Sequence, residues 1–103
     1  MSRYLVLWKA NPSAWPTDPK QLADILEGVT GAGSAMRASG AIAELGWFTA
    51  QEGYAVFEAD SKAALLAMVQ GFFPLYTQDI HEIVPWEEGR TAILASARQA
   101  AAL

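Results

Sequence analysis

Residues 41–59 have the sequence AIAELGWFTAQEGYAVFEA, and this stretch decides the fold. It contains two apolar runs with aromatic and β-branched members, Ala41–Thr49 and Gly53–Ala59, joined by the short connection at residues 50–53. Such runs are typical of β-strands, and a glycine in a short connection between them is typical of a hairpin. The stretch therefore predicts two antiparallel strands in the middle of the chain.

A helical segment lies on each side of this hairpin. The first begins at residues 17–19 (TDP), where a capping aspartate precedes a proline, and ends at Gly40, a typical helix C-cap. The second begins at residues 60–61 (DS) and ends at residues 71–74 (GFFP). Apolar residues in both segments recur three or four positions apart, which is the spacing of one helix face.

Strand-like runs occupy the two outer positions, Arg3–Lys9 and Tyr76–Val84, and an alanine-rich helix is predicted from Glu87 onward. The order before that last helix is strand, helix, strand, strand, helix, strand. This order predicts an α+β fold of the ferredoxin-like type, with one domain over residues 1–103. Its four-stranded antiparallel sheet carries both helices on one face, and the other face is then wet, dimerised or wrapped around a ligand.

The composition limits the partners that the protein can have. Hydrophobic residues make up 52% of the chain and charged residues only 17%, below the roughly 25% of an ordinary soluble domain. We therefore expect a homodimer that hides the excess apolar surface. A net charge of −4 without a basic run argues against nucleic acid and anionic membranes.

Targeting signals and cysteine are missing from the sequence. The absence of cysteine excludes disulfides and thiolate metal sites. No apolar stretch approaches the ~20 residues that a membrane helix needs, and a strand beginning at Arg3 leaves no room for a signal peptide. We therefore expect a cytoplasmic protein.

Strand alternation separates the two faces of the predicted sheet. With Thr49 placed opposite Tyr54, we expect the helices to cover Leu5, Leu7, Ala55, Phe57 and Ile80. The open face then carries aromatic side chains with a few ionisable groups, namely Tyr4, Trp8, Trp47, Tyr54, Glu58, Asp79 and His81. This mixture is typical of a small-molecule pocket, although a hairpin register shifted by one residue would reverse part of the assignment.

Four segments carry a resemblance to a known group: residues 3–8 (RYLVLW), 53–58 (GYAVFE), 72–76 (FFPLY) and 79–84 (DIHEIV). They resemble the dimeric α/β-barrel superfamily, in particular small bacterial proteins of unassigned function near the muconolactone isomerase-like branch. The likeness extends to about Trp86 and implies that two sheets pack face to face into a barrel, with one internal cavity in each subunit. Members include isomerases, cofactor-free monooxygenases, polyketide cyclases and haem-handling enzymes, so the likeness favours a small-molecule site without naming a reaction.

His81 is the only histidine, and Asp79 lies two residues away on the same predicted strand face. An imidazole beside a carboxylate suits general acid–base catalysis near neutral pH, whereas the alternative is a barrel-lining or interface histidine that only forms hydrogen bonds. Glu58, near a strand end, is suited to proton abstraction next to a carbonyl, although such glutamates are more often solvated. A lone histidine supplies no ligand spacing, so we expect no metal site and no cofactor.

The aromatic residues Tyr4, Trp8, Trp47 and Tyr54 are expected to form the walls of a ligand site, or else to pack in a core or dimer interface. The expected function is binding of an apolar, ring-bearing metabolite in a dimeric barrel, with cofactor-independent isomerisation or cyclisation if the protein is an enzyme. The alternatives are a non-catalytic carrier and a purely structural dimer. A haem-linked oxygenase is less favoured because His81 is not part of an axial-ligand motif, and the roles of Trp15 and of the C-terminal helix are left open.

Overall fold

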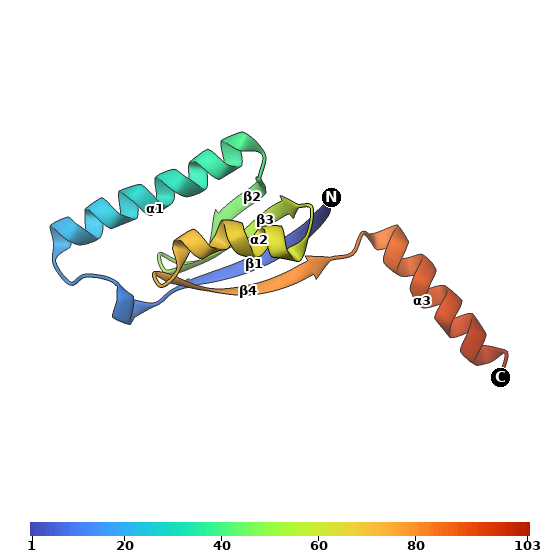
Figure 1. The fold of residues 1–103 in the computed structure, drawn as a ribbon. Coiled ribbons are helices and arrows are strands. Elements are labelled where there is room, and N and C mark those ends of the chain that lie inside the picture. The colour runs from blue at the N-terminus through green and yellow to red at the C-terminus, as the bar shows by residue number, and fades with distance from the viewer.

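The computed structural model describes residues 1–103 as one antiparallel sheet with three α-helices (Figure 1). The strands are β1 (Ser2–Ala10), β2 (Ile42–Trp47), β3 (Glu52–Ala59) and β4 (Tyr76–Ile83). The helices are α1 (Pro19–Ser39), α2 (Lys62–Val69) and α3 (Trp86–Ala101), with two single 3₁₀ turns, η1 (Pro12–Ala14) and η2 (Gln70–Phe72). The predicted α+β class and the four-stranded antiparallel sheet are confirmed.

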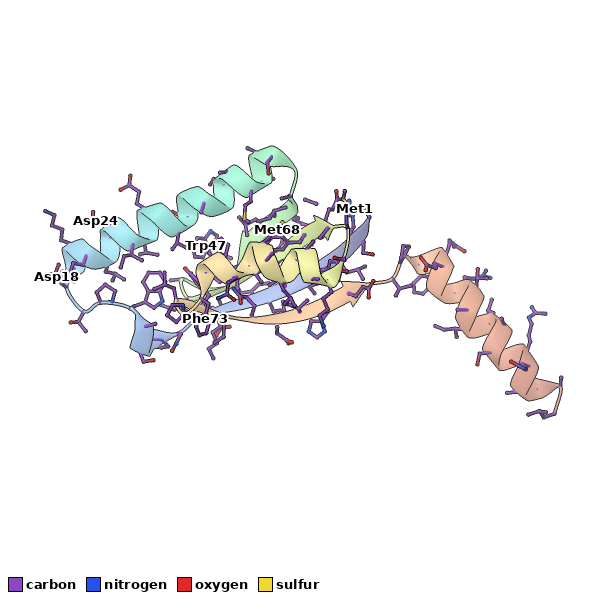
Figure 2. All side chains as sticks on the ribbon, viewed as in Figure 1. Met1, Asp18, Asp24, Trp47, Met68 and Phe73 are labelled. Carbon is purple, nitrogen blue, oxygen red and sulfur yellow. The ribbon has the colours of Figure 1, made fainter.

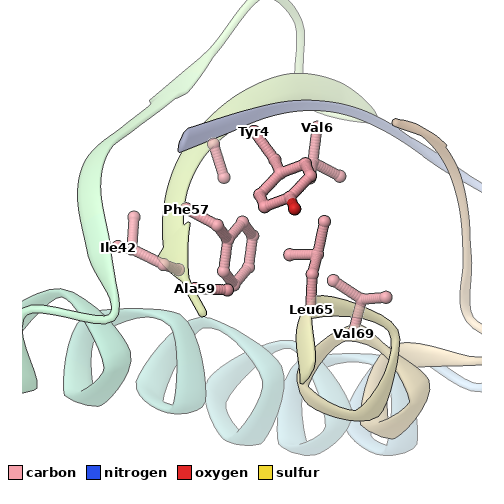
Figure 3. Close-up of a cluster of buried hydrophobic side chains, with 8 residues drawn as sticks. Tyr4, Val6, Ile42, Phe57, Ala59, Leu65 and Val69 are labelled. Carbon is pink, nitrogen blue, oxygen red and sulfur yellow. The ribbon is translucent and has the colours of Figure 1, made fainter. Parts of the chain in front are cut away.

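The sheet has the strand order β2-β3-β1-β4, so the first and third strands are central. Helices α1 and α2 lie on the same face of the sheet, and side chains from both pack against one core (Figure 3). Helix α3 instead projects away from this body (Figure 1), which makes the molecule 65 Å long but only 27 and 22 Å across. None of the three helices combines the length and apolar character needed to cross a bilayer.

Local capping explains where the two packed helices begin and end. Asp18 accepts a hydrogen bond of 3.0 Å from the Gln21 amide at the start of α1, and Gly40 ends this helix with a φ of 87°. Ser61 accepts one of 3.1 Å from the Ala64 amide at the start of α2. These caps satisfy amides that have no partner within the helix, and a left-handed residue at the C-terminus favours glycine.

The core lies between the sheet and the two helices (Figure 3). Leu65 of α2 is completely buried there, beneath the ring of Tyr4. Met36 of α1 packs against the same cluster from the other helix. The buried members are Tyr4, Val6, Ile42, Ala55, Phe57, Ala59, Leu65 and Val69.

The predicted face of β1 is wrong. Tyr4 and Trp8 face the helices, and Tyr4 is buried in the core, whereas Leu5 and Leu7 lie on the open face. The reason is the pairing with β3, in which Tyr4 lies opposite Phe57. Directly opposed residues share a face of the sheet, so a helix-facing Phe57 brings Tyr4 to the same side.

The predicted hairpin register is also wrong. Gly46, not Thr49, lies opposite Tyr54, because β2 ends at Trp47 and the amides of Phe48 and Thr49 both donate to the Glu52 carbonyl, at 2.8 and 3.1 Å. The observed register differs from the predicted one by an odd number of residues, and such a shift exchanges the two faces of a strand. Trp47 therefore lies on the helix side of the sheet and not on the predicted open face.

Candidate ligand-binding cavity

A cavity of about 180 Å³ lies between the two packed helices and the sheet. Ten of its 14 lining residues are hydrophobic. An apolar cavity of about 150 Å³ is large enough to admit benzene, so this one has the size of a one-ring molecule. The lining consists of Val6, Trp8, Val29, Thr30, Gly33, Ser34, Leu45, Trp47, Ala55, Phe57, Val69, Phe72, Tyr76 and Gln78.

Small residues on facing elements leave this space open. Helix α1 presents Val29, Thr30, Gly33 and Ser34 to the cavity, which are neighbours on one helix face. Gly33 is buried, and a Cβ there would lie 3.3 Å from the Leu45 side chain, so α1 is already close to β2 at this point. Trp47 lines the cavity but is 57% exposed, which places the opening beside its indole.

Three aromatic rings line one wall of the cavity and meet edge to face. The Trp8 ring centroid lies 5.1 Å from that of Trp47, with an interplanar angle of 86°. On its other side, Trp8 lies 5.4 Å from Tyr76 at 85°. Trp15 continues the row outside the cavity, 5.5 Å from Tyr76, and its Nε1 donates to the Leu75 carbonyl at 2.8 Å.

Gly53 allows the two indoles to meet. Trp8 on β1 and Trp47 on β2 both lie opposite Gly53 on β3, the strand between them. A Cβ at Gly53 would collide with the Trp8 ring and with the Gly46 carbonyl. Because glycine has no side chain, the rings from the two flanking strands contact each other over the middle one.

The polar groups of the lining are few, and all are uncharged at neutral pH. Gln78 donates from Nε2 to the Val69 carbonyl at 3.4 Å, and Thr30 donates to the Leu26 carbonyl at 2.7 Å. Tyr76 is the only ionisable side chain among the lining residues. Burial raises the pKa of Tyr76 above its ordinary value, so its hydroxyl stays protonated at neutral pH and can donate a hydrogen bond.

The raised pKa of Tyr76 predicts a loss of stability at alkaline pH. Above the ordinary value of 10.0, the unfolded chain releases the Tyr76 proton while the folded chain keeps it, so the free energy of unfolding falls as pH rises. Tyr76→Phe should show a smaller decline than the unmodified protein when urea unfolding is compared at pH 8 and at pH values above 10. Parallel declines in the two proteins would contradict the assignment.

The open face of the sheet carries His81 and Asp79. The His81 Nε2 lies 3.0 Å from the Asp79 Oδ2, and both side chains are more than half exposed. Across β1, His81 lies opposite Leu5 and Asp79 lies opposite Leu7. The pair is therefore formed, on a broad and partly apolar surface.

Glu58 and Tyr54 also lie on the open face, each held by another partner. The Arg3 guanidinium contacts the Glu58 carboxylate at 2.7 Å, and the Tyr54 hydroxyl donates to Glu44 at 2.6 Å. The hydrogen bond to Glu44 is the main cause of a raised pKa at Tyr54, with desolvation second. Neither residue lines the cavity.

The structure therefore divides the predicted site between two faces of the sheet. Trp8 and Trp47 line the cavity and Tyr4 packs in the core beside it, whereas Tyr54, Glu58, Asp79 and His81 lie on the open face. Tyr76 and Gln78 were not predicted as site residues. Both lie an even number of positions from the helix-facing Ile80, and strand alternation could have placed them on the same face.

Comparison with known protein families and with curated proteins finds no match for this chain. The function is therefore inferred from the geometry of the cavity and of the open face, and the resemblance to dimeric α/β barrels stays a prediction.

Proposed function

We propose that this protein is a non-catalytic binder of a small, apolar, ring-bearing molecule, which it holds in the cavity between α1, α2 and the sheet. The supporting observation is an apolar cavity of one-ring size with Trp8, Trp47 and Tyr76 along one wall. Aromatic rings favour edge-to-face and offset contacts with a flat ligand. The Tyr76 hydroxyl and the Gln78 amide would orient a single polar substituent.

Binding is favoured over the isomerase or cyclase alternative by the position of the acid–base groups. A general acid or base must lie within hydrogen-bond reach of the reacting atom. His81, Asp79 and Glu58 are on the open face, and the sheet lies between them and the cavity. Within the cavity, a tyrosine with a raised pKa is a hydrogen-bond donor rather than a base at neutral pH.

We further propose that the fold is ferredoxin-like and that two copies pack through their open sheet faces into a dimeric barrel. The strand order β2-β3-β1-β4, with α1 and α2 on one face, supports this assignment. Leu5, Leu7 and Val56 are only partly covered on the open face of the single chain. Pairing of two such faces would bury these residues and enclose His81 and Asp79.

Binding of p-cresol, a one-ring probe with a single hydroxyl, tests the cavity. We expect saturable binding by calorimetry and a higher melting temperature, since a ligand that binds only the folded state stabilises it. Ser34 lines the cavity from α1, so Ser34→Phe would place a ring in it and should weaken binding at least about tenfold, or about 1.4 kcal/mol. Ala32→Phe, on the opposite side of α1, is the matched control and should bind normally.

The His81→Ala variant distinguishes this binding proposal from the isomerase or cyclase alternative. It should leave p-cresol affinity unchanged, because His81 lies across the sheet from the cavity. Loss of binding in His81→Ala, or equal binding in Ser34→Phe and Ala32→Phe, would place the ligand elsewhere. No saturable binding of p-cresol, toluene or indole to the unmodified protein would overturn the proposal.

A further inference from the structure

Helix α3 has no buried residue and projects from the body, with its side chains surrounded by open space (Figures 1 and 2). Trp86 is 81% exposed and Ile93 is 70% exposed. An isolated helix of 16 residues is marginally stable in water, and most helices depend on the packing of an apolar face. Helix α3 therefore lacks, within one chain, the packed apolar face on which most helices depend.

An apolar stripe runs along α3, interrupted by Arg90, which lies four residues after Trp86 and forms an ion pair of 3.9 Å with Glu87. Trp86, Ile93, Ala97 and Ala100 recur at the spacing of a single helix face. Glu87, Leu94 and Arg98 follow one edge of this stripe. The stripe thus has a large side chain at the N-terminal end of α3, small side chains at the C-terminal end, and charged residues along one edge.

This pattern is self-complementary when two copies of α3 run antiparallel about Ile93. Trp86 and Ala100 lie equally far from Ile93, so the large ring of each copy lies opposite the small side chain of the other. Along the charged edge, Glu87 of each copy comes level with Arg98 of the second copy, and symmetry makes this pair twice. A parallel pair would instead bring Trp86 against Trp86 and would place Glu87 of one copy and Arg98 of the other on opposite sides of the contact.

We propose that α3 is an interaction surface for a second copy of this chain, forming an antiparallel two-helix contact with its two-fold axis at Ile93. An isologous contact of this kind uses the same patch on both subunits. It involves α3 alone and does not require the sheet faces to meet. It is thus independent of the ligand cavity and of the proposed barrel.

Single cysteines test the contact directly, because the chain contains none of its own. Facing positions on packed helices come within disulfide range, so oxidised Ile93→Cys should form a covalent dimer on a denaturing gel. Ala95→Cys lies on the opposite side of α3 and should not. Ala100→Cys lies on the same stripe and should cross-link only if the helices are parallel.

A charge exchange provides a second readout. Glu87→Arg or Arg98→Glu alone should weaken the association, roughly tenfold, because each places like charges together twice. The double variant Glu87→Arg/Arg98→Glu should restore it. The two positions are about 16 Å apart along one helix, too far to pair within a chain, so rescue must occur between copies.

Each outcome of the cross-linking and charge-exchange experiments either supports or overturns the antiparallel contact. Cross-linking at Ile93 without cross-linking at Ala95 or Ala100, together with rescue by the double variant, supports the proposal. Equal cross-linking at Ile93 and Ala95, cross-linking at Ala100, or failure of the double variant to restore association would overturn it. Circular dichroism checks that the body stays folded, as expected for changes on a helix that does not pack against it.

Discussion

Replacement of Leu65 by alanine is expected to lower the free energy of unfolding by about 2–5 kcal/mol. Leu65 has 0% exposure and points from α2 toward Tyr4 and Phe57 in the core (Figure 3). The change removes buried methyl and methylene groups and leaves a void, because the surrounding sheet and helix can relax only in part. Urea unfolding followed by circular dichroism measures the loss.

Leu66→Ala is the matched control for this prediction. It makes the same chemical change at the next residue of the same helix, but the Leu66 side chain is 49% exposed. We expect a loss below about 1 kcal/mol, since little apolar surface is withdrawn from water at this position. Similar losses in the two variants would mean that α2 presents a different face to the sheet.

Leu5→Asp is expected to dissociate the proposed barrel. Leu5 lies near the centre of the open face, on β1 between Val56 of β3 and His81 of β4. Two-fold symmetry would place two such carboxylates in one interface, where an unpaired charge is costly to desolvate. The affinity between the sheet faces should fall by at least about a hundredfold, or about 2.7 kcal/mol.

The measurement is sedimentation equilibrium in an Ile93→Asp background, in which pairing through α3 is removed. Ile93→Asp alone should remain dimeric through the sheets, and Ile93→Asp/Leu5→Asp should be monomeric. Ile93→Asp/Leu66→Asp is the control, because it adds the same charge on the outer side of α2. A monomeric Ile93→Asp protein, or a dimer that survives Leu5→Asp, would count against the barrel but would leave the cavity proposal untouched.

The elements of the fold could be predicted because their signals are local. Asp18, Gly40 and Ser61 mark helix ends by hydrogen bonds within a few residues of themselves. The face of β1 could not be predicted in the same way. Alternation places Leu5 and Tyr4 on opposite faces of β1, but the residues on both faces are apolar. Only the pairing of Tyr4 with Phe57 decides which face the helices cover.

The site was predicted less well than the fold because it depends on register. The predicted hairpin has Thr49 opposite Tyr54, whereas the structure has Gly46 there and Gly53 opposite both Trp8 and Trp47. That difference moves Trp47 to the helix side, while Tyr54 stays on the open face. Non-local pairing thus decided which aromatic residues could share a ligand, and neither composition nor spacing contains that information.

The contact of Trp8 and Trp47 over Gly53 also has an optical consequence. Two indoles whose centroids are 5.1 Å apart exchange excitation energy faster than either emits, so they fluoresce as a coupled pair. A guest molecule that enters beside both rings would alter their common emission and their near-ultraviolet circular dichroism. Trp86, the exposed first residue of α3, contributes a separate solvent-exposed signal, and Trp86→Phe would remove it. The protein then has its own spectroscopic reporter of whether the cavity is filled.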